Sequence, residues 1–87
     1  MSEFRTDDMA MVSCLKFFGQ VPTSVQWIDR KCYWFFERGA ELQELVESYL
    51  ERRLSVEPKQ FNFIFGETKK EFYKLYDAHS GRNVGRQ

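Results

Sequence analysis

The 87-residue sequence has one histidine, two cysteines, two prolines and no net charge. Because 13 basic and 13 acidic side chains balance, the composition argues against a protein that depends on strong positive charge to bind polyanions. The longest uninterrupted apolar run, residues 32–36, is far shorter than a membrane span requires. A single histidine leaves little material for a Ser-His-Asp or Cys-His catalytic site. These shortages favour a protein that is neither an enzyme nor embedded in a membrane.

Cysteine and histidine are also spaced wrongly for metal binding. Cys14 and Cys32 sit in apolar segments, and the sequence has no Cys-x-x-Cys or His-x-x-x-His pair, so we expect neither structural zinc nor a disulfide. His79 reads as a residue at the end of a helix rather than a catalytic base. Since residues 1–8 are polar and acidic rather than a signal peptide, we expect a cytosolic protein with two reduced thiols and no cofactor.

Aromatic residues are abundant: nine Phe, four Tyr and two Trp. Five of them fall within residues 27–36, where segments 25–28 and 32–36 flank the charged residues 29–31. This pattern predicts a β-hairpin. Because the turn lacks Gly and Asn, a loop of three or four residues is favoured over a tight primed turn.

The second strand of this hairpin is apolar on both faces. Alternation places Tyr33 and Phe35 on one face and Trp34 and Phe36 on the other. Such a strand is either covered on both sides or leaves one apolar face exposed.

Three helices are predicted. Residues 6–8 supply an N-cap for the first, at about 7–18, and Gly19 suits its end. The second runs from Ala40 to about residue 53 with an acidic, solvated face. Pro58 opens the third, an amphipathic helix of about five turns. Gly66 inside that helix indicates either a close helix crossing or a break.

Together these elements predict an α+β domain with the order β-α-β-β-α-α. Its small antiparallel sheet is built on the 25–36 hairpin, and Phe4-Arg5 could end an N-terminal edge strand. We expect residues 1–78 to form the single domain and residues 79–87 to form a flexible basic tail. Charge is uneven: residues 1–57 have a net charge of −3, from seven basic and ten acidic side chains, and residues 58–87 a net charge of +3, from six and three.

Four blocks, Phe4–Asp8, Trp34–Glu37, Glu41–Tyr49 and Leu54–Phe61, resemble in their order and spacing a small domain of bacterial and phage proteins catalogued only as a domain of unknown function. The resemblance implies a small intracellular or phage-borne β-α-β-β-α-α domain and brings no activity or catalytic residues. This chain departs from the pattern at its hairpin turn and in the unusually aromatic segment 61–66.

The function that these features favour is a non-catalytic module that contacts another protein. The candidate contacts are Trp27, Tyr33, Trp34 and Phe63, and self-association through the same face is a variant of this hypothesis. A phage-borne modulator of host machinery fits the size and the resemblance. The alternative is nucleic-acid binding with hairpin aromatics stacked on bases and phosphate contacts from Lys69, Lys70, Lys74, Arg82 and Arg86.

Overall fold

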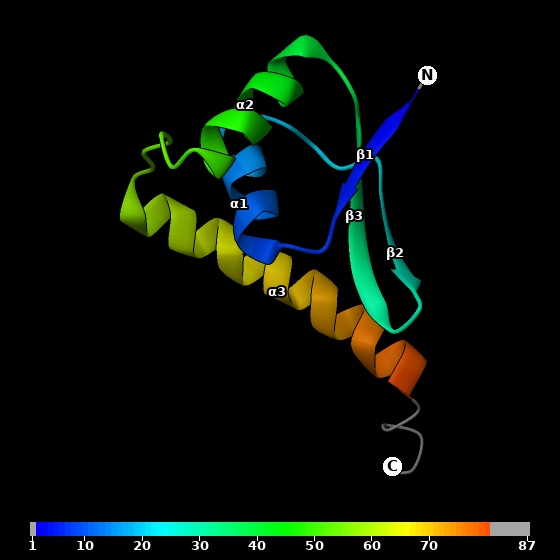
Figure 1. The fold of residues 1–87 in the computed structure, drawn as a ribbon. Helices are drawn as coiled ribbons and strands as arrows, with labels where there is room; N and C mark the ends of the chain where they lie inside the picture. Colours follow the sequence, from blue (N-terminus) through cyan, green and yellow to red (C-terminus); the bar gives the residue numbers. More distant parts are fainter. Residues whose placement is uncertain (1, 81–87) are drawn as a thin grey trace.

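Residues 2–80 are described by the computed structural model, and within that range the chain forms three strands and three helices. In chain order these are β1 (Glu3–Thr6), α1 (Met9–Phe17), β2 (Ser24–Ile28), β3 (Lys31–Glu37), α2 (Ala40–Leu50) and α3 (Pro58–Ser80). The predicted α+β class, element order and N-terminal edge strand are confirmed. The sheet is antiparallel with the order β1-β3-β2, so β3 is the central strand. The described helices lie on one side of the sheet (Figure 1).

The hairpin turn differs from the prediction of a longer loop. Ile28 pairs directly with Lys31, which leaves a two-residue turn of Asp29 and Arg30. Both residues have positive φ, 52° and 69°, as a type I′ turn requires. The register that buries Cys32 and its alternate neighbours on one face outweighs the unfavourable turn residues, because a one-residue slip would move every side chain to the other face.

Helix α1 begins two residues after its predicted start at about residue 7, because Asp8 is its N-cap, and it ends at Phe17, one residue before its predicted end. The Asp8 carboxylate accepts hydrogen bonds from the backbone N–H groups of Ala10 and Met11 at 3.0 and 3.1 Å. Gly19, with φ +97°, terminates the helix: its N–H donates to the Lys16 carbonyl, and the Gln20 N–H donates to the Leu15 carbonyl. This pair of bonds is a Schellman motif.

Helix α2 ends at Leu50, three residues before the predicted end. Arg52 has φ +60°, which stops the helix. The Arg52 N–H donates to the Tyr49 carbonyl at 3.0 Å, and the Arg53 N–H donates to the Ser48 carbonyl at 2.8 Å. A second Schellman motif therefore closes α2, with arginine where glycine is usual.

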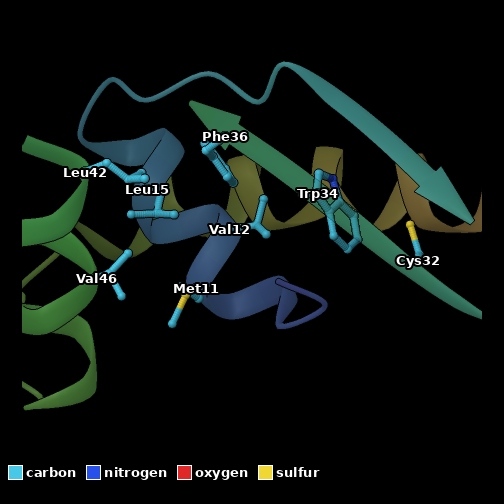
Figure 2. Packing of buried hydrophobic residues seen from close by; sticks show 8 residues of the cluster. All are labelled: Met11, Val12, Leu15, Cys32, Trp34, Phe36, Leu42 and Val46. Carbon is cyan, nitrogen blue, oxygen red and sulfur yellow. The ribbon is translucent and has the colours of Figure 1, made fainter. Parts of the chain in front are cut away.

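The hydrophobic core lies between the sheet, α1 and α2. Figure 2 shows α1 in the middle of this layer, with Leu15 towards α2 and Val12 towards β3. Trp34 and Phe36 from β3 are among the largest fully buried side chains. Since both come from the same face of β3, that face is the one buried against the helices. The buried cluster is Met11, Val12, Leu15, Cys32, Trp34, Phe36, Leu42 and Val46.

Helix α3 packs along α1 and then reaches the hairpin (Figure 1). It continues without a break through Gly66, and a Cβ at that position would meet nothing within 4 Å. Both explanations offered for Gly66, a break and a close crossing, are therefore wrong. The helix also includes His79 and Ser80, so the predicted tail overlaps its last two residues; residues 81–87 lie outside the described range. Within residues 2–80, no helix combines the length and apolarity needed to traverse a bilayer.

Candidate functional site

Trp34 is part of the core rather than a surface contact. Its side chain is 0% exposed, and its indole Nε1–H donates to Glu71 Oε1 of α3 at 2.8 Å. The same oxygen accepts from Lys16 Nζ of α1 at 2.9 Å. Trp34 thus joins the sheet to both helices through one carboxylate, and the prediction that it contacts a partner is corrected.

A buried polar contact continues this network between α1 and α3. Thr68 is completely buried; its hydroxyl donates to the Ile64 carbonyl and accepts from Ser13 and Lys16. No buried side-chain polar atom lacks a partner in the described residues. The network is fully satisfied, so it serves to position α3 rather than to bind a ligand.

Trp27 is covered by the C-terminal half of α3. Its ring lies 6.1 Å from Phe72 and 6.0 Å from Tyr76, measured between ring centroids. His79 stacks on it at 5.7 Å with an angle of 8° between the planes. Because Trp27 and His79 pack on each other, the histidine closes the end of the hairpin, and Trp27 is only partly available to a partner.

The opposite side of the sheet carries no helix in the described part of the chain. We call it the open face; alternation and register assign to it Glu3, Arg5, Ser24, Gln26, Ile28, Lys31, Tyr33, Phe35 and Glu37. Its centre is the half-buried Tyr33 of β3, and the Arg5 guanidinium lies over the Tyr33 ring, 4.4 Å from its centroid. Phe35, directly opposite Arg5, extends the aromatic surface along the central strand.

The remaining predicted residues lie on α3. Phe63 is 66% exposed, and the pattern of exposed residues puts it on the outward side with Lys70 and Lys74. Lys70 pairs with Glu67 at 3.6 Å, and Lys69 lies 5.5 Å from the Phe65 ring centroid. Arg82 and Arg86 lie outside the described residues. The structure therefore separates the predicted contacts: Tyr33 is on the sheet, and Phe63 and the lysines are on α3.

A cavity of about 490 Å³ opens beside the helices. Its walls come from α1, the end of α2 and the α2–α3 connection, and they consist of Cys14, Tyr49, Leu50, Arg52 and Leu54. No pattern in the sequence predicted this cavity. Arg52 gave no such signal, because the predicted helix continued to about residue 53 and included it, whereas α2 ends at Leu50.

Two titratable groups in this cavity stay neutral at ordinary pH. Burial, and then the hydrogen bond that the Tyr49 hydroxyl donates to Asp8 Oδ2 at 3.0 Å, raises the pKa of Tyr49 to about 12. Burial, and then the Asp8 carboxylate, raises the pKa of Cys14. A protonated thiol is a poor nucleophile, so the raised pKa of Cys14 lowers its reactivity.

Comparison with protein-family models identifies a related family. A family model described as a domain of unknown function (DUF5659) matches residues 1–74. No curated protein matches the chain, and no solved structure does. The match covers most of the sequence and almost all of the described fold, and it confirms the expected kinship with a domain of unknown function. This chain is a member of the DUF5659 family.

Proposed function

We propose that this chain is a small, non-catalytic module that binds another protein through its open face. The observation that carries the proposal is the pairing of Arg5 with Tyr33 at the centre of that face, 4.4 Å from guanidinium carbon to ring centroid. Tyrosine and arginine are among the residues that contribute most energy at protein interfaces. Both are held on paired strands, so little conformational entropy is lost when a partner binds.

The charges of the open face favour a protein over a nucleic acid. Arg5 and Lys31 are balanced by Glu3 and Glu37, so the face has no excess positive charge to attract phosphates. The balanced rim and aromatic centre match the usual arrangement of protein interfaces, in which a desolvated core is surrounded by polar residues.

The nucleic-acid alternative has weaker support. Of the three described candidate lysines, Lys70 is paired with Glu67 and Lys69 lies against Phe65. Only Lys74 has no such contact in residues 2–80. A helix with internally balanced charges is typical of solvated surface.

The proposal also includes the cellular compartment. We place the module in the cytosol, because Cys14 and Cys32 are both buried free thiols, as is usual in a reducing compartment. The bacterial or phage origin suggested by the sequence resemblance fits a domain of this size.

The test is an affinity pull-down from a lysate of the source cells, with and without nuclease, read by mass spectrometry. Wild type is compared with the double variant Arg5→Thr, Tyr33→Thr, which removes the pair but keeps residues suited to strands. The matched control, Lys70→Gln, Tyr73→Gln, removes one basic and one aromatic side chain from exposed positions on α3. Circular dichroism checks that each variant is folded.

We expect the wild type to recover a discrete protein, with or without nuclease treatment. The α3 control variant should recover the same protein, and the open-face variant should not. Recovery of a second copy of the chain with the same dependence would identify the partner as the protein itself. Equal retention by both variants would contradict the proposal. Material that is lost on nuclease treatment, with binding that falls steeply as salt rises, would favour nucleic acid instead.

A further inference from the structure

We infer that the cavity between α1, the end of α2 and the α2–α3 connection binds a small apolar molecule that carries one carboxylate. Its lining residues come from two helices and a connecting segment, and none belongs to the open face. The inference is therefore independent of the proposed protein-binding function, and either one can fail without the other.

The size of the cavity fits such a ligand. The cavity volume of about 490 Å³ lies within the roughly 300–1,000 Å³ typical of small-molecule sites. The walls are aliphatic at Leu50 and Leu54 and aromatic at Tyr49, and the thiol of Cys14 completes them. The lining is therefore mixed, with aliphatic side chains beside polar groups that can fix the orientation of a ligand.

Arg52 supplies the charged group. It has no ion pair among residues 2–80, whereas its neighbour Arg53 is paired with Glu51 at 2.7 Å. An arginine guanidinium can bind a carboxylate with two parallel hydrogen bonds, a geometry that lysine cannot reproduce. The cavity thus combines aliphatic side chains and polar groups with one cation that has no counter-ion among residues 2–80.

The backbone at Arg52 is a second, independent observation. Arg52 occupies the left-handed position that follows the C-cap of α2, at φ +60°, a conformation that is sterically unfavourable for a residue other than glycine. Gly19 fills the equivalent position after α1. A non-glycine residue at a position where glycine would fit without strain points to a functional use of its side chain. Here the side chain of Arg52 lines a cavity.

The other polar groups orient the ligand. The Asp8 carboxylate already accepts two backbone N–H bonds and the Tyr49 hydroxyl. The phenol is therefore committed to Asp8, and the negative charge on that side repels a second carboxylate. A bound acid would place its carboxylate at Arg52 and its apolar part against Cys14 and Leu54.

The test uses the full chain and octanoate, with the methyl ester of octanoic acid as the uncharged probe. Titration is followed by isothermal calorimetry and by amide shifts in ¹⁵N–¹H NMR spectra. We expect saturable binding of octanoate, with amide shifts concentrated at the cavity residues. The ester should bind at least about tenfold more weakly than octanoate, because it lacks the charged hydrogen bond to Arg52.

Two variants separate binding from structure. Arg52→Gly removes the cation and relieves the backbone strain, so it should be more stable than wild type yet bind octanoate at least about tenfold more weakly. Arg53→Gln removes the adjacent, ion-paired arginine and should leave affinity within about twofold of wild type, because exposed paired charges contribute little.

The inference would be overturned by absence of saturable octanoate binding, by equal affinity for the ester, or by equal losses in the two variants. Binding of a peptide with a free C-terminal carboxylate and an apolar last residue, without binding of octanoate, would also overturn it, since the site would then serve a protein end.

Discussion

Arg52 and Gly19 occupy equivalent positions in two Schellman motifs of the same chain. Each follows the C-cap of a helix and has positive φ, +60° for Arg52 and +97° for Gly19. Each donates its N–H to a carbonyl three residues earlier, at 3.0 and 2.9 Å. The two sites thus provide an internal comparison between an arginine and a glycine in one backbone environment.

Replacing Arg52 by glycine is expected to raise the free energy of unfolding by about 1 kcal/mol, because glycine adopts the left-handed conformation without steric cost. The converse change, Gly19→Ala, should lower it by about 1 kcal/mol or more. A Cβ at Gly19 would meet nothing within 4 Å, so any loss there reports backbone conformation alone. Urea denaturation of the two variants measures both effects, and equal signs would contradict this account.

The hairpin turn offers a similar gain. Asp29 and Arg30 both have positive φ, and Asn-Gly is the preferred pair for such a turn. The double variant Asp29→Asn, Arg30→Gly should therefore raise the melting temperature, with a stabilisation of about 1–2 kcal/mol. A lower melting temperature would indicate that these side chains stabilise the turn by contacts of their own.

Trp34 and Tyr33 should respond very differently to the same change. Trp34→Phe removes buried volume and the N–H donated to Glu71, so we expect a loss of about 1–3 kcal/mol. Tyr33→Phe removes only a hydroxyl from the open face and should change stability by about 0.5 kcal/mol or less. Chemical denaturation measures the free energy of unfolding of both variants. Equal losses would contradict the assignment of the two faces of β3.

Stability should fall at alkaline pH. Burial, then the Glu71 carboxylate, raises the pKa of Cys32 from 9.0 to about 11, and burial with the Asp8 hydrogen bond raises that of Tyr49 from 10.0 to about 12. Both groups hold their proton more tightly in the folded state, so their stabilising contribution is complete below about pH 9 and is lost as the pH rises to 12.

Denaturation midpoints measured across that range test the prediction. The variant Tyr49→Phe should flatten the decline between about pH 10 and 12. Tyr73→Phe, at a side chain that is 55% exposed, should leave the decline unchanged. An unchanged slope in Tyr49→Phe would contradict the role assigned to the hydroxyl.

Local signals in the sequence predicted much of the fold. Residues 6–8 and Gly19 indicated the ends of α1 to within two residues, Pro58 indicated the start of α3, and alternation indicated β3. What alternation alone could not decide was which face of β3 is buried, because both faces carry two aromatics. That choice depends on α1 and α3: Trp34 donates to Glu71 of α3, which also accepts from Lys16 of α1, and all three residues are distant in the sequence.

The candidate sites were harder to predict for the same reason. Arg5 reaches Tyr33 only because β1 pairs with β3 in a register that places Arg5 opposite Phe35. The cavity depends on the early end of α2 at Leu50, which places Arg52 outside the helix, whereas the apolar spacing of the sequence suggested a longer helix. Long-range register and a strained helix end leave no mark in local periodicity.

The central claim, protein binding through the open face, is tested most directly by photo-crosslinking in the source cells. A photoreactive amino acid replaces Gln26, which is exposed opposite Tyr33, or Lys70 on α3 as the control position. We predict a specific protein adduct from position 26 that disappears when Arg5→Thr, Tyr33→Thr is introduced, and no such adduct from position 70. An adduct formed only from position 70, or with nucleic acid rather than protein, would contradict the account.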